Sequence, residues 1–136
     1  MCPERTNEPV VILLAEDDEI NQQIVRHILA TLPFVELEIA CDGKAALEAA
    51  ISRRYDLMIF DRQMPFISGD RVIRHLRAAR TINLSTPIIQ FTADADHVSI
   101  PQGALDHADA IVPKPVQSAQ LISTVLKLLR REIGNN

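Results

Sequence analysis

Short apolar runs and segments with helical spacing of apolar residues follow one another along the chain, which predicts strands and helices in turn. Several short apolar runs are continuous, which suits strands buried on both faces of a parallel sheet. The five expected strands cover residues 10–15, 34–40, 57–60, 87–91 and 110–112. Between these strands the apolar residues recur every three to four positions, as on one side of a helix. An apolar stripe over 121–133 predicts a strong last helix. The pattern indicates an α/β fold, with five parallel strands and five helices that cover both faces of the sheet.

The first expected helix has an apolar surface that is wide for packing against a sheet alone. It extends to residue 32 and stops before Pro33, which cannot continue a helix. Its apolar residues form two neighbouring stripes, Ile20, Ile24 and Ile28 in one and Val25, Leu29 and Leu32 in the other. Either both stripes belong to the core, or the wider edge is a docking face for a helix of a partner. The sequence leaves both interpretations open.

Polar residues that could carry chemistry follow four of these strands. Asp61 ends the third strand, and four consecutive acids over 16–19 follow the first. Thr92 and Lys114 come after the fourth and fifth strands. Each of them could be an ordinary loop residue, such as an aspartate that caps a turn. Because parallel strands bring their carboxyl ends to one edge, we expect these groups to converge where open α/β sheets bind ligands.

Five short motifs, in this order, resemble those of response-regulator receiver domains, the phosphoacceptor modules of two-component signalling. They are Glu16-Asp17, Asp42-Gly43 with Ala46-Leu47, Asp61 with Met64-Pro65, Thr92-Ala93 and Lys114-Pro115. Each motif is weak by itself, but the five together are specific, and the resemblance covers residues 10–133. The run over 16–22 is most similar to receivers of hybrid histidine kinases. The resemblance implies a flavodoxin-like, doubly wound sheet in the strand order 2-1-3-4-5.

The resemblance also implies a role for each polar group at this edge. Asp61 would attack the phosphorus of a phosphohistidine and become an aspartyl phosphate. The implied Mg²⁺ ligands are Asp17, Asp61 and the backbone carbonyl of Gln63, with Glu16 acting mainly through a water. The resemblance also implies that Thr92 and Lys114 contact the phosphoryl oxygens. The phosphodonor would be a histidine kinase or a histidine phosphotransfer protein. Such a domain catalyses only its own phosphorylation and dephosphorylation, so we do not expect an enzyme with a separate substrate.

One departure from the family's pattern affects how a signal would leave the domain. The position three residues before Lys114 is usually an aromatic residue that rotates inward on phosphorylation, but here it is Ile111. The switch residues are therefore expected to be Thr92 and Ile111, without an aromatic rotamer change. The resemblance further implies a cis peptide bond between Lys114 and Pro115, which aims the lysine into the site.

The fourth expected helix, over residues 94–107, is predicted to be short or irregular. Pro101 removes a backbone donor there and Gly103 adds backbone freedom. Since Ile111 cannot supply the aromatic switch, we hypothesise that this segment exists in two arrangements and repacks when the domain is phosphorylated. Its downstream protein partner cannot be read from the sequence.

Length and charge restrict the remaining possibilities. The chain has 136 residues, which suits one domain over 10–133 between short tails at 1–9 and 134–136. A formal net charge of -4 argues against general binding to nucleic acid or to an anionic membrane. Cys2 and Cys41 show no metal-ligand or disulfide pattern, and no apolar run is long enough to span a bilayer. We therefore expect a soluble protein in the reducing cytoplasm.

Three other functions compete with a phosphoacceptor. An aspartyl phosphatase also places an aspartate at a strand end, but it needs a second acid where this chain has Gln63. A nucleotide-binding switch needs a glycine-rich phosphate loop, and the four glycines do not form one. A degenerate receiver that only binds partners would lack one of the expected site residues, and none is missing.

Overall fold

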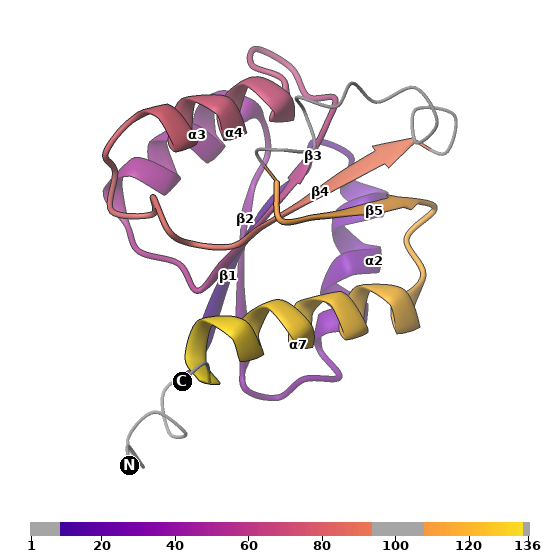
Figure 1. Cartoon of the computed structure of the whole chain (residues 1–136). Coiled ribbons are helices and arrows are strands. Elements are labelled where there is room, and N and C mark those ends of the chain that lie inside the picture. The colour runs from indigo at the N-terminus through magenta and orange to yellow at the C-terminus, as the bar shows by residue number, and fades with distance from the viewer. Residues whose placement is uncertain (1–8, 94–107, 135–136) are drawn as a thin grey trace.

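Residues 9–93 and 108–134 are described by a computed structural model, in which they form a five-stranded parallel sheet with helices on both faces (Figure 1). The strand order is β2-β1-β3-β4-β5, so the flavodoxin-like order implied by the resemblance is confirmed. The described part of the chain has four helices, and the fourth helix expected at 94–107 lies outside it. The elements are β1 (Val10–Ala15), α2 (Glu19–Leu29), β2 (Val35–Ala40), α3 (Gly43–Ser52), β3 (Leu57–Asp61), α4 (Gly69–Ala78), β4 (Ile88–Ala93), β5 (Ala110–Lys114) and α7 (Ser118–Gly134).

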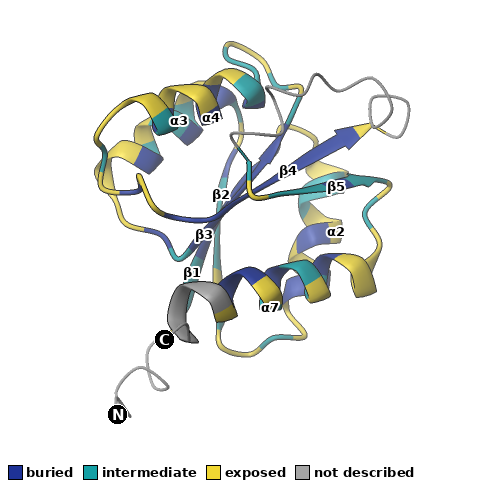
Figure 2. Ribbon diagram, in the orientation of Figure 1, coloured by how far each residue is buried: buried dark blue, intermediate teal, exposed yellow. Residues whose placement is uncertain are grey.

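Successive side chains along each strand point to opposite faces of the sheet, so the core is divided into two clusters, one on each face. In β1, Ile12 and Leu14 pack into the cluster shared with α2 and α7, whereas Leu13 and Ala15 pack into the cluster shared with α3 and α4. All four side chains are buried, and most of β3 and β4 is dark blue in Figure 2. Because helices cover both faces, these strands appear in the sequence as continuous apolar runs rather than as alternating ones.

The first helix is shorter than expected, because α2 ends at Leu29 and residues 30–34 form turns. The prediction that it extends to residue 32 is wrong, since a residue directly before a proline avoids the helical conformation, and Leu32 precedes Pro33. At its other end Asp18 caps the helix by accepting a hydrogen bond from the Ile20 amide at 2.9 Å. Among the described helices, none is both long and apolar enough to cross a lipid bilayer.

Only part of the apolar surface of α2 belongs to the core. Val25, Ile28 and Leu29 are buried against the sheet and α7. Ile20 is 70% exposed and Ile24 is 41% exposed, and the helix shows yellow turns on its outer side in Figure 2. The interpretation that both stripes are entirely core is therefore wrong for these two isoleucines.

The register of the strands brings their carboxyl ends to one level. Ala15, the last residue of β1, lies opposite Phe60, one residue before Asp61. Ala93, the last residue of β4, lies opposite Lys114 on β5. Residues that directly follow β1 therefore meet the ends of β3 and β5, as parallel pairing predicts.

Candidate functional site

A cavity of about 240 Å³ opens at this carboxyl edge of the sheet. Five of the residues predicted for the site line it: Glu16, Asp17, Asp61, Gln63 and Lys114. Each comes from the end of a strand or from the loop directly after it. The sheet thus brings together residues that are up to 98 positions apart in the chain.

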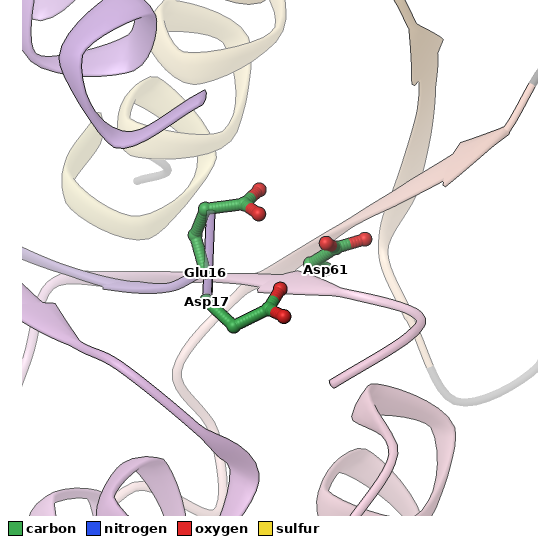
Figure 3. A group of neighbouring side chains, drawn as sticks. All are labelled: Glu16, Asp17 and Asp61. Atoms are coloured by element: carbon green, nitrogen blue, oxygen red, sulfur yellow. The ribbon is translucent and has the colours of Figure 1, made fainter. Parts of the chain in front are cut away.

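Three carboxylates occupy the centre of the cavity. One oxygen each from Glu16, Asp17 and Asp61 lies within 4.8 Å of the other two, and Figure 3 shows the three groups around one small space. Glu16 and Asp61 are buried, whereas Asp17 is exposed. Oxygen ligands in this number suit a hard divalent cation. Within the described chain, the buried Oε1 of Glu16 accepts no hydrogen bond. A buried acceptor without a donor needs another partner, and a cation would supply one.

Lys114 supplies the positive charge beside these acids. Its Nζ donates a hydrogen bond to Oδ2 of Asp61 at 2.9 Å and lies 3.6 Å from Oε1 of Glu16, which is an ion pair but longer than a hydrogen bond. Burial alone would lower the pKa of Lys114, but the hydrogen bond and charge of Asp61, together with Glu16, raise it above its ordinary value. The lysine is therefore charged at neutral pH. The predicted cis peptide bond between Lys114 and Pro115 is confirmed.

Glu16 titrates much closer to neutral pH than an ordinary glutamate. Burial, and after it the negative charge of Asp61, raises its pKa from 4.5 to about 7. Lys114 and the amide of Asp18, which donates to Oε2 of Glu16 at 3.2 Å, oppose the shift without cancelling it. A cation that binds this carboxylate near neutral pH would therefore compete with a proton.

The two predicted switch residues lie on neighbouring strands. Thr92 is fully buried near the end of β4, and its Oγ1 has no hydrogen-bond partner in the part of the chain that the structure describes. Ile111 is half-buried on β5, opposite Gln90 of β4. Their roles in switching stay a prediction, and the segment 94–107 that we expect to respond lies outside the described residues.

The loop after Asp61 is held close to the sheet and to two helices. Gly69, the first residue of α4, donates its amide hydrogen to the carbonyl oxygen of Arg62 at 2.9 Å. A Cβ at Gly69 would overlap the carbonyl oxygen of Asp61, and one at Gly43 would overlap that of Ile67. These glycines are needed because backbone, rather than a side chain, fills the adjacent space. The loop that carries Gln63 is thereby fixed at both ends.

The sequence analysis missed several residues near the site, among them Asn21, Arg62, Asp70 and Gln90. Arg62 lines the cavity, and its Nε donates to Oδ2 of Asp70 at 3.1 Å. Gln90, in the middle of β4, donates its side-chain amide to Oδ1 of Asp70. Gln90 is 2% exposed and interrupts a run that we interpreted as continuously apolar. A single polar residue inside a buried strand was the available signal, because such a group needs a partner.

A family model described as the response regulator receiver domain matches residues 12–126. The chain belongs to this family. The resemblance noted from the five motifs is therefore confirmed, and the acidic cavity is at the carboxyl edge of a receiver domain. Receivers act in two-component signalling, and the match covers most of the 136 residues.

Curated relatives include both response regulators and a kinase. The receiver is 34% identical over 127 residues to the response regulator ArlR of Staphylococcus saprophyticus, covering 92% of this chain and 54% of that protein. It is 26% identical over 123 residues to the osmosensing histidine protein kinase SLN1 of Saccharomyces cerevisiae, covering 87% of this chain and 10% of the kinase. The chain thus spans about half the length of the bacterial relative and a small part of the yeast one.

Solved receiver structures share this fold. The receiver domain of sensor histidine kinase PA1611 from Pseudomonas aeruginosa, described with a magnesium ion coordinated in its active site cleft, is 28% identical with a TM-score of 0.76. The alignment covers 89% of this chain and 98% of that one. The receiver domain of the Francisella response regulator 1452 is 27% identical with a TM-score of 0.75, over 90% of this chain and 98% of that one.

Proposed function

We propose that this receiver accepts a phosphoryl group from a phosphohistidine on the carboxylate of Asp61, with Mg²⁺ bound at the acidic cavity. The observation that supports it best is the meeting of three carboxylates with the Lys114 ammonium at the carboxyl edge of the sheet. The Mg²⁺ ligands would be Glu16, Asp17, Asp61 and the carbonyl oxygen of Gln63. When bound, the cation supplies positive charge that offsets the carboxylates and the phosphoryl oxygens.

The residues around Asp61 assist the transfer by position and charge. A carboxylate oxygen of Asp61 attacks phosphorus, the bond from phosphorus to the donor imidazole nitrogen breaks, and the imidazole keeps the electron pair. Lys114 already contacts Asp61 and is placed to follow the negative charge onto a phosphoryl oxygen. Within the described residues the buried hydroxyl of Thr92 has no hydrogen-bond partner, so it can donate to another phosphoryl oxygen. Water later cleaves the acyl phosphate and returns the carboxylate and inorganic phosphate.

We further propose that the phosphodonor docks on the outer surface of α2. Ile20, Ile24 and Ile28 line an open groove of about 490 Å³ together with Gln23 and His27. This groove adjoins the acidic cavity through the first turn of the same helix. A histidine kinase or histidine phosphotransfer protein, acting in the cytoplasm, would place an amphipathic helix in the groove and its phosphohistidine over Asp61. The domain modifies only itself, so it is proposed as a phosphoacceptor rather than an enzyme with a separate substrate.

Phosphorylation by a small donor tests the site directly. With acetyl phosphate and Mg²⁺, intact-protein mass spectrometry should show one added phosphoryl group, and hydroxylamine should remove it. Asp61→Asn should abolish the addition while the far-ultraviolet circular dichroism spectrum stays unchanged. Full labelling of Asp61→Asn would overturn the assignment of Asp61.

The docking surface is tested separately, because acetyl phosphate needs no docking. Ile24→Ser should slow phosphotransfer from a phosphorylated histidine phosphotransfer protein, while leaving the rate with acetyl phosphate unchanged. Ile51→Ser is a matched control, since Ile51 is a half-exposed isoleucine on α3, on the opposite face of the sheet. Equal slowing by both variants would contradict docking on α2.

A further inference from the structure

A partly buried hydrogen-bonded chain links the middle of β4 to the loop after Asp61. Gln90 lies among apolar neighbours on β4, opposite Phe60 of β3. Its side-chain amide donates to one carboxylate oxygen of Asp70, in the first turn of α4, and Arg62 donates to the other at 3.1 Å. Both oxygens of Asp70 are therefore used, and the Arg62–Asp70 pair is only about a quarter exposed at either side chain (24% and 21%). The motifs shared with the receiver family include none of these three residues.

The backbone of Arg62 is fixed from two sides, and its side chain forms an ion pair with Asp70. The Arg62 amide donates to the carbonyl oxygen of Phe91 at 3.0 Å, and its carbonyl oxygen accepts from Gly69 at 2.9 Å. The side chain nevertheless lines the same cavity as the acids. A guanidinium is always charged and binds carboxylates in a two-pronged geometry. If it turned into the cavity it would pair with the carboxylates that we assign to Mg²⁺.

We propose that Asp70 and Gln90 are positioning residues, which keep the Arg62 guanidinium paired with Asp70 at the wall of the acidic cavity and so leave the carboxylates available to Mg²⁺. This inference rests on the proposed function, because it concerns the cation of that site. Gln90 fixes the Asp70 carboxylate, and Asp70 fixes Arg62. The pair also explains why a polar amide is present inside a buried strand, where a leucine would pack without needing a partner.

A purely structural role for the same contacts makes a different prediction. If Asp70 and Gln90 only join α4 to β4, then their loss weakens the fold, and it does so whether or not Arg62 is present. If they act by holding Arg62, their loss weakens Mg²⁺ binding only while Arg62 can enter the cavity. The double variant that also lacks the guanidinium therefore separates the two explanations.

Titration of ¹⁵N-labelled protein with Mg²⁺, followed by amide chemical shifts, measures the affinity without any phosphodonor. Asp70→Asn should weaken Mg²⁺ binding roughly three- to tenfold, as expected for one more positive charge near the site at moderate screening. Arg62→Gln should bind Mg²⁺ at least as tightly as wild type, because it removes a positive charge beside the site. Arg62→Gln combined with Asp70→Asn should recover the wild-type affinity to within about twofold, with the added charge removed.

Two results would overturn the inference: unchanged affinity in Asp70→Asn, or a double variant that binds as weakly as Asp70→Asn alone. If Asp70→Asn does not fold, Gln90→Leu with and without Arg62→Gln gives the same comparison, with a smaller loss. A wild-type protein that neither binds Mg²⁺ nor is phosphorylated would instead overturn the proposed function. A wild type that does both, with no Arg62-dependent effect, would contradict only the positioning role.

Discussion

Replacing Glu16 by glutamine should stabilise the metal-free domain, although Glu16 belongs to the proposed site. Its pKa is raised from the ordinary 4.5 to about 7, first by burial and then by the charge of Asp61. In the folded state the group therefore binds its proton more tightly than in the unfolded state. Stability must consequently fall as the pH rises from about 4.5 to 7, because ionising the buried group costs free energy.

The size of the effect follows from the shift. At about 1.36 kcal/mol for each pKa unit, the rise corresponds to roughly 3 kcal/mol of unfolding free energy, lost in full only above pH 7. Glutamine has nearly the same shape and cannot ionise. Glu16→Gln should therefore match wild type near pH 4.5 and exceed it by up to about 3 kcal/mol at pH 8.

Urea denaturation in EDTA, followed by circular dichroism between pH 4.5 and 8, measures this difference. Glu48→Gln, on an exposed position of α3, makes the same chemical change away from the cavity and should leave the wild-type pH dependence intact. Parallel pH profiles for wild type and Glu16→Gln would refute the reasoning. At pH 8 with saturating Mg²⁺ the advantage of the variant should shrink, because the cation stabilises the wild-type carboxylates more.

Three further outcomes are expected. Mg²⁺ at a hundredfold excess over its Kd should raise the unfolding free energy by about 2.7 kcal/mol, and Asp17→Ala should lose most of that gain in urea denaturation. Gly69→Ala should lose about 2 kcal/mol or more, since its Cβ would overlap backbone, and no loss would mean that the loop can move aside. Asn83→Ala removes buried hydrogen bonds to three backbone groups and should lose about 2–3 kcal/mol without changing Mg²⁺ affinity.

The convergence of the acids with Lys114 could be predicted because it depends on rules of parallel sheets. Continuous apolar runs indicated strands covered on both faces, and polar residues at their ends then had to meet at one edge. The contact between Lys114 and Asp61, which are 53 positions apart, is one result of that convergence. The roles of these residues came from the family resemblance, since spacing by itself cannot distinguish a metal ligand from a helix cap such as Asp18.

Other contacts could not be predicted, because they depend on how helices pack onto the sheet. The pairing of Gln90 with Asp70 requires the first turn of α4 to lie over β4, and no local pattern specifies that placement. The same applies to the surface of α2. Helical periodicity shows that Ile20 and Ile24 lie on one side of the helix, but only the packed structure shows that this side is exposed.

The charges at the cavity explain why stability and cation binding should change in opposite directions. With Glu16, Asp17 and Asp61 ionised, three negative charges face one ammonium, so two remain for a divalent cation. Removing one acid relieves the repulsion in the free domain but also removes a ligand. If Arg62 were released from Asp70, its guanidinium would pair with the carboxylates of the cavity and relieve the same repulsion. We therefore expect Asp70→Asn to lose the ion pair with Arg62 and keep much of its stability, while Mg²⁺ binding falls.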